Sequence, residues 1–243
     1  MKSTILFFCL FVSIMACSGT KQQMLRSEGF NIDQSDPKAV AIANEVVEAS
    51  GGATAWNDTR YLGWNFFGSR QHVWDKQTGD VYIRSLKDPI EITMNINDKT
   101  GEVMMNNKLT TEPDSLSKYL QKGYEWWVND SYWLVLPFKL QDSGVTLKSL
   151  GDSTTEAGQS ADILSLTYDN VGVTPQNKYH IYVDKTTRLI TQWDFYTNAE
   201  DEEPRFKIPW KSYFPYGSIL LSGDRGRMAI TDIRVGESLA RFF

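Results

Sequence analysis

The sequence predicts a mostly β, α+β fold in which helices cover the concave face of a large curved antiparallel sheet, a half-open β-barrel. Segments with the two-residue hydrophobic period of strands fall into two runs, 60–106 and 145–235. Between these runs, the hydrophobic residues of 112–128 have the spacing of a helix. About a dozen strands in meander order are too many for one flat sheet, so the sheet is expected to curl.

The N-terminus has the layout of a secretory signal peptide. Lys2 precedes an apolar run, Ile5 to Met15, which as a helix is about 16 Å long. That length is too short for a hydrocarbon core of about 30 Å. Ile14-Met15-Ala16-Cys17 resembles a bacterial lipobox, in which the cysteine is acylated and becomes the first mature residue. We therefore expect lipidation of Cys17, the alternative being an ordinary signal peptide that carries a cysteine near its end.

Three segments are expected along the chain. Residues 1–16 are the signal peptide, residues 17–34 a lipidated flexible tether, and residues 35–243 a single domain, because no long linker or internal repeat interrupts them. Two or three acyl chains on Cys17 anchor a protein stably to a membrane. Ser18 is compatible with outer-membrane sorting, and the following residues are not acidic. The expected location is the bacterial cell envelope, with the protein lipid-anchored to the outer membrane on its periplasmic face.

Local signals set the elements of the domain in order. Asp36 is a good N-cap, Pro37 fits the first helical position, and Gly51-Gly52 ends that helix. A short helical turn is expected at 53–58. The helix at 112–128 is weakened by Gly123, and Asn129-Asp130-Ser131 offers a break. Strands separated by turn residues are expected at 60–67, 70–76, 80–86, 90–97, 102–106, 145–150, 161–168, 177–184, 189–197, 205–212, 219–222 and 227–235.

Charge and cysteine content exclude several functions. The chain has a formal net charge of −5 and a pI of about 5.2, so it lacks the basic footprint of a nucleic-acid-binding protein. Cys9 leaves with the signal peptide, and Cys17 is expected to be acylated. The mature domain therefore has no cysteine for a disulfide, a thiolate nucleophile or a metal-thiolate site.

No catalytic residue, metal site or cofactor is predicted. The two histidines, His72 and His180, fall in expected strands and are interpreted as surface or half-buried residues. Gly223-Asp224-Arg225-Gly226 is interpreted as a turn, because no Lys-Ser/Thr follows as in a phosphate-binding loop. Glu125 and Asp130 lie near a tryptophan cluster and are expected to be solvated.

The aromatic residues are the feature that stands out, at 13% of the chain. They crowd the helical block and one face of the first expected strand. Either they fill a packed core, or part of them lines an apolar cavity between sheet and helices. The candidate ligand-binding residues are Trp64, Phe66, Trp126, Trp127, Tyr132, Trp133 and Phe138.

The order of these features resembles a known family. A lipobox, a helix ending in Gly-Gly, strands, the helical segments 124–127 and 130–140, and further strands are similar to the outer-membrane lipoprotein-sorting proteins of Bacteroidota-type bacteria. The chain resembles the LolA/LolB lipoprotein carriers more remotely. The resemblance covers most of 36–243 and implies a half-open barrel whose apolar cavity holds acyl chains. No short motif in it is diagnostic of activity.

The expected function is therefore that of a membrane-anchored envelope lipoprotein. It would bind a lipid, an acyl chain or a lipoprotein in an apolar cavity, as a non-enzymatic carrier, acceptor or chaperone. One alternative is a glycan- or protein-binding lipoprotein that uses exposed aromatic side chains, and a second is an enzyme of unknown class. The expected partners are the membrane, through Cys17, and the ligand; nucleic acid is not expected, and the oligomeric state stays open.

Overall fold

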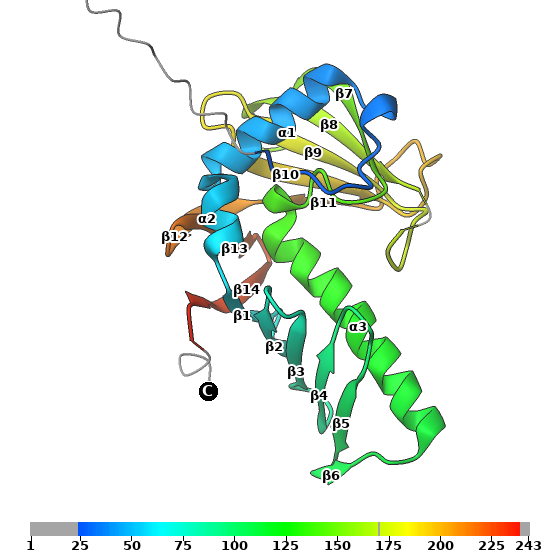
Figure 1. The fold of residues 1–243 in the computed structure, drawn as a ribbon. Helices are drawn as coiled ribbons and strands as arrows, with labels where there is room; N and C mark the ends of the chain where they lie inside the picture. Colours follow the sequence, from blue (N-terminus) through cyan, green and yellow to red (C-terminus); the bar gives the residue numbers. More distant parts are fainter. Residues whose placement is uncertain (1–23, 170, 239–243) are drawn as a thin grey trace, which may run out of the picture.

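A computed structural model describes residues 24–169 and 171–238, and within them the predicted mostly β, α+β fold class is confirmed. The described strands form two antiparallel sheets, and the larger sheet is not closed into a barrel (Figure 1). The difference from the expected single curved sheet is that the second run of strands divides between the two sheets. Cys17 and the predicted signal peptide lie outside the described residues.

The larger sheet joins the first strands of the chain to the last. Its nine strands run in the order β12-β13-β14-β1-β2-β3-β4-β5-β6. Because β1 pairs with β14, the first described strand of the chain lies beside the last. The strands are β1 (Tyr61–Phe66), β2 (Arg70–Asp75), β3 (Asp80–Ser85), β4 (Ile90–Asn95), β5 (Gly101–Met105), β6 (Lys108–Leu109), β12 (Lys211–Tyr216), β13 (Ile219–Arg225) and β14 (Met228–Gly236).

The smaller sheet is a simple meander. Its five strands run in the order β11-β10-β9-β8-β7, and they are β7 (Val145–Thr154), β8 (Ser160–Tyr168), β9 (Lys178–Asp184), β10 (Ile190–Tyr196) and β11 (Phe206–Pro209). The strand expected at 205–212 is split at Trp210, between β11 and β12. The Trp210 side chain is buried in the core beneath the smaller sheet, and its backbone N–H donates to the carbonyl of Thr191. The chain thus changes sheets at this residue.

Two helices at the N-terminus are followed by one long helix in the middle of the chain. These are α1 (Pro37–Ala49), α2 (Gly52–Asp58) and α3 (Pro113–Val135), with short 3-10 turns η1 (Ile32–Gln34) and η2 (Leu136–Phe138). Helix α1 covers the smaller sheet, and α3 runs from that sheet to the far strands of the larger one (Figure 1). No helix among the described residues combines the length and hydropathy needed to cross a membrane.

Two side chains at helix positions bind to the sheets. Asp36 is the N-cap residue of α1 and Pro37 its first helical residue, as expected, but the Asp36 side chain makes no cap; its carboxylate accepts from the backbone N–H of Ser149 and from Lys148, and so fixes α1 to β7. The expected break at 129–131 is absent, and α3 continues through it. The Asp130 carboxylate reaches across to β2 instead of capping a new helix.

The two large hydrophobic clusters of the described residues form the main core. One lies between the larger sheet, α2 and α3, and the other between the smaller sheet and α1. Trp133, near the end of α3, packs against both. Residues 24–34, expected as flexible tether, pack on the domain: Phe30 is buried in the second core, and the Asn31 side chain donates to Gly144 and Thr146.

Candidate functional site: an aromatic cavity beneath the long helix

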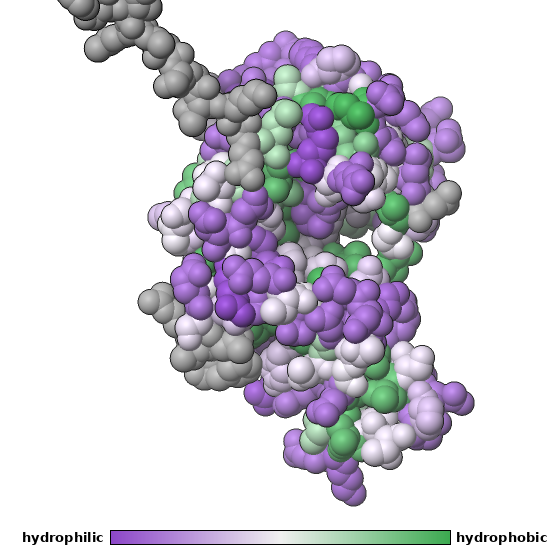
Figure 2. All heavy atoms as spheres, in the orientation of Figure 1, coloured by the Kyte–Doolittle hydropathy of each residue, from purple (hydrophilic) through white to green (hydrophobic). Residues whose placement is uncertain are grey.

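A cavity of about 670 Å³ lies between the C-terminal half of α3 and the smaller sheet. Its walls come from α3, the segment 139–145, the end of β8 and the β8–β9 connection, the strands β9, β10 and β11, and the end of β1 in the larger sheet. The surface is hollowed where the upper and lower parts of the molecule meet, and hydrophobic residues border this hollow (Figure 2). The volume is typical of a small-molecule site, for which about 300–1,000 Å³ is usual.

Aromatic side chains form a large part of the wall. Phe195 on β10 lies directly between Tyr179 on β9 and Phe206 on β11, in register, with ring centroids 5.3 and 4.8 Å away. Trp193 points to the same side of β10, since it is two residues from Phe195. From α3, Trp133 meets Trp193 edge-on at 4.5 Å. The aromatic residues of the wall are Phe66, Tyr124, Trp127, Tyr132, Trp133, Tyr168, Tyr179, Trp193, Phe195 and Phe206.

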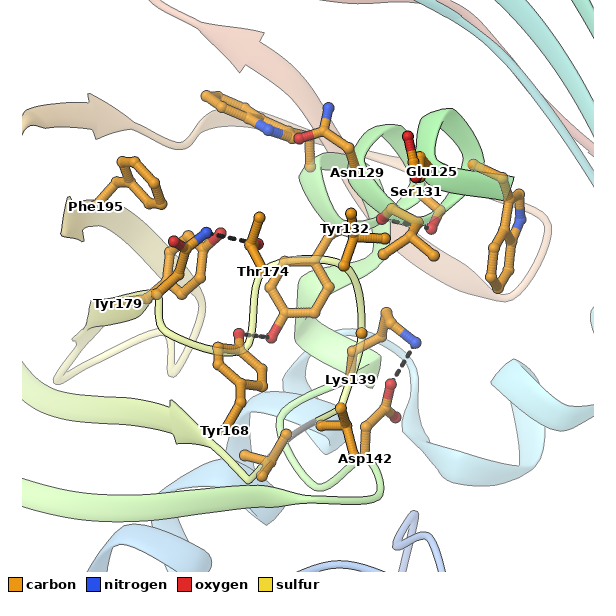
Figure 3. A pocket seen from close by; sticks show the side chains of 18 of the residues that line it. Glu125, Asn129, Ser131, Tyr132, Lys139, Asp142, Tyr168, Thr174, Tyr179 and Phe195 are labelled. Carbon is orange, nitrogen blue, oxygen red and sulfur yellow. Dashed lines mark hydrogen bonds and ion pairs between the residues drawn. The ribbon is translucent and has the colours of Figure 1, made fainter. Parts of the chain in front are cut away.

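Polar and charged side chains occupy several places on the wall between the aromatic ones. The hydroxyls of Tyr132 and Tyr168 lie 2.5 Å apart and share a hydrogen bond, and Lys139 forms an ion pair with Asp142 (Figure 3). Burial raises the pKa of Tyr132 and of Tyr168 well above the usual value, and that of Tyr179 to about 12. All three phenols are therefore protonated at neutral pH, so they can donate hydrogen bonds.

The structure places four of the seven candidate residues in the cavity wall: Phe66, Trp127, Tyr132 and Trp133. The other three lie elsewhere. Trp64 is buried and stacks on His72, with ring centroids 4.6 Å apart, and Phe138 stacks on Trp56 at 4.4 Å. The Trp126 ring packs against the cations of Arg70 and Lys122, at 5.1 and 4.8 Å. The aromatic cluster of the helical block thus contributes both to a packed core and to a cavity.

Sequence reasoning missed the half of the wall that the smaller sheet provides. Tyr168, Tyr179, Trp193, Phe195 and Phe206 all line the cavity. Alternation along 189–197 places Trp193 and Phe195 on one face, a signal that could have marked this strand. Nothing local indicated that this face would meet α3 rather than a solid core.

A second cluster of polar groups is buried behind the cavity wall. Arg70 donates two hydrogen bonds to the Asp130 carboxylate, Nε to Oδ2 at 2.6 Å and Nη2 to Oδ1 at 2.8 Å. His72 Nε2 lies 2.7 Å from the same Oδ2. His72 and Asp130, expected to be surface or half-buried and solvated respectively, are both buried. The reason is that each supplies a hydrogen-bond partner for the other inside the α3–sheet interface.

The electrostatics of this cluster indicate a structural role, in which Asp130 attaches α3 to β2. Burial opposes ionisation of Asp130, but hydrogen bonds from Arg70 and His72 outweigh it and hold the pKa of Asp130 below its usual value. Burial lowers the pKa of His72, so the neutral ring donates from Nε2, while Nδ1 has no partner among the described residues. Neither His72 nor Asp130 belongs to the cavity wall, so a ligand in the cavity does not reach them.

The remaining candidates for acid–base chemistry are dispersed. His180 bonds through Nδ1 to the Tyr196 hydroxyl at 2.9 Å, and burial together with nearby Lys178 lowers its pKa to about 4. Glu125 lies in the cavity wall and accepts from Gln121 one turn earlier on α3. Among the described residues, no three His, Cys, Asp or Glu side chains converge as metal ligands would.

Comparisons with known proteins give distant likenesses only. No protein-family model and no curated protein matches the sequence. A DUF1329 family protein from Desulfovibrio piger ATCC 29098 is similar in structure, with a TM-score of 0.42 and 14% identity over 86% of this chain and 98% of that chain. MucB is similar with a TM-score of 0.29 and 15% identity over 84% of this chain; the chain spans 60% of the MucB chain. Function is therefore inferred from the cavity and its walls.

Proposed function

We propose that this protein binds a lipid, an acyl chain or the acylated end of a lipoprotein in its aromatic cavity, as a non-enzymatic carrier, acceptor or chaperone. The observation that carries the proposal is the cavity of about 670 Å³ between α3 and the smaller sheet. Apolar concave sites with a few placed polar groups are the usual form of small-molecule pockets. Each methylene group transferred from water into such a site contributes about 0.8 kcal/mol.

The proposed setting is the periplasmic face of the outer membrane, with Cys17 acylated. The lipobox-like sequence Ile14-Met15-Ala16-Cys17 supports this part of the proposal. Residues 18–23 would connect the anchor to the first described residues. A carrier or acceptor held at a membrane meets a lipid ligand at its source, which makes the two parts of the proposal consistent.

No comparable observation supports the two alternative functions, a glycan- or protein-binding lipoprotein and an enzyme. Trp126, Trp127 and Trp133 are half-buried, and Trp127 and Trp133 each stand edge-on to another tryptophan. They do not form the shared flat platform on which a sugar would stack. For an enzyme, the tight His72–Asp130 pair would need to lie in a cleft, and its side chains are 0% exposed.

Ligand binding is tested by displacement of a fluorescent fatty acid from the purified, delipidated full chain, and by native mass spectrometry with added phospholipid. We expect saturable binding and a lipid adduct. Val128→Asp introduces a carboxylate into the cavity wall, one helical turn from Glu125, which should weaken binding at least about tenfold because burying an unpaired charge is costly. Ser117→Asp, on the exposed part of the same helix, is the matched control. Absence of both adduct and displacement would refute the proposal.

A further inference from the structure

The hydrogen bond between Tyr132 and Tyr168 on the cavity wall engages one of their two hydroxyl protons. Tyr132 comes from α3 and Tyr168 from the end of β8, and both hydroxyls face the cavity region (Figure 3). Each phenol has one O–H donor. Their mutual hydrogen bond, at 2.5 Å, consumes one of the two protons. No residue in 24–169 or 171–238 accepts the other proton from either hydroxyl.

On this basis, and resting on the proposed function, we infer that the Tyr132–Tyr168 pair donates a hydrogen bond to a neutral oxygen acceptor of the bound lipid. The ligand class is an apolar chain that carries an ester or ketone carbonyl. A plain hydrocarbon offers no acceptor, and a free fatty acid offers a charged one. The pair would thus fix the position of the carbonyl while the aromatic walls hold the chain.

Two features strengthen the pair as a donor. A hydroxyl that accepts one hydrogen bond becomes a better donor for the next, so the tyrosine that accepts within the pair donates more strongly to the ligand. Burial also keeps both phenols protonated, because it raises the pKa of each. A buried donor left without an acceptor carries a desolvation cost, so a ligand lacking the oxygen is disfavoured.

The charges of the wall favour a neutral acceptor over an anion. The charged residues that line the cavity are two carboxylates, Glu125 and Asp142, and one ammonium, Lys139. Lys139 already forms an ion pair with Asp142. A fatty-acid carboxylate would therefore enter an aromatic site without a free cation, at a large desolvation cost. A carbonyl accepts from the tyrosines without that cost.

The test compares three probes of similar size: methyl laurate, laurate and tridecane. Their binding to the full chain is measured by displacement of a neutral apolar fluorophore. We expect methyl laurate to bind about tenfold more tightly than tridecane, the worth of one good hydrogen bond, and more tightly than laurate. The double variant Tyr132→Phe/Tyr168→Phe keeps both rings and should bind methyl laurate and tridecane equally. Because both partners become apolar together, its folding should be nearly unaffected.

Tyr196→Phe is the matched control, since it removes a hydroxyl that bonds to His180 outside the cavity; it should keep the preference for methyl laurate. Equal binding of methyl laurate and tridecane to the unmodified protein would overturn the tyrosine assignment while leaving lipid binding intact. Tighter binding of laurate would also overturn it, in favour of an anion site. If none of the probes binds, the proposed function fails, and the tyrosine assignment fails with it.

Discussion

Asp130 is the residue on which the attachment of α3 to the larger sheet depends most. Its carboxylate accepts from Arg70 and His72 of β2, and its side chain is 0% exposed. Asp130→Asn removes the charge that compensates Arg70 and should lower the free energy of unfolding by about 2–3 kcal/mol, the lower part of the range for breaking a buried pair, because Arg70 is partly exposed. Urea denaturation followed by circular dichroism measures this loss.

Glu125→Gln provides the comparison for Asp130→Asn. Glu125 is a carboxylate on the same helix that, within the described part of the chain, pairs with no cation and bonds only to Gln121, so its substitution should change the free energy of unfolding by less than about 0.5 kcal/mol. Equal effects of the two substitutions would show that the buried cluster does not hold the helix.

The sequence could not have shown this cluster at the level of single residues. His72 and Asp130 are separated by 58 positions, and the turn-forming character of Asn129-Asp130-Ser131 favoured a helix break. Only the packing of α3 on β2 removes Asp130 from water and makes the helix continue. By contrast, the helical spacing of residues 112–128 correctly predicted the first part of α3, because helical spacing is a local property.

At the scale of elements, α3 packs closely on β4 at Gly123. A Cβ atom built there would lie 3.0 Å from Cδ1 of Ile92 and 3.1 Å from Sδ of Met94. Gly123→Val should therefore overpack the interface and lower the free energy of unfolding by about 1–3 kcal/mol. Ser117→Val adds the same β-branched side chain at an exposed position of α3 and should cost no more than its lower helix propensity, a few tenths of a kcal/mol. Thermal denaturation of both variants decides between them, and a Gly123→Val protein as stable as Ser117→Val would contradict the close packing.

Gly123 also shows which features of helices and strands can be predicted from the sequence. The sequence marks Gly123 as a weak point in a helix, and the structure gives it a packing role in a continuous one. Strand positions were predicted closely because alternation is local, yet 205–212 divides at Trp210. That division follows from burial of the indole in the second core, which involves residues far away in the chain.

At the scale of the whole molecule, local sequence patterns could not predict how the strands are assigned to two sheets. The pairing of β1 with β14 brings Tyr61 opposite Gly236, and no pattern in either segment specifies it. The cavity is a consequence of this arrangement, since α3 extends from one sheet to the other and Trp133 contacts both cores. The hydrophobic periodicity thus predicted the strands and helices. The cavity could not be predicted in this way, because it depends on the pairing of strands far apart in the chain.

Both histidines of the molecule are held neutral by the fold. Burial lowers the pKa of His72, against the pull of Asp130. Burial and the charge of Lys178 lower the pKa of His180 to about 4. In the unfolded chain, both rings titrate near about 6.5. As the pH falls below about 6.5, the unfolded chain gains protons that the folded molecule does not take up.

The free energy of unfolding should therefore be greatest above about pH 6.5 and should fall as the pH is lowered from 7.5 to 5, because the unfolded state binds more protons there. Asp194, whose pKa burial raises, acts in the opposite direction at lower pH, so the measurement stops at pH 5. His180→Gln removes one titrating ring and should reduce the proton uptake linked to unfolding by up to about one proton. Urea denaturation at each pH, for the unmodified protein and for His180→Gln, gives the two slopes. Identical slopes would mean that the fold does not hold His180 neutral, whereas a shallower slope for the variant is the result that a buried, uncharged His180 requires.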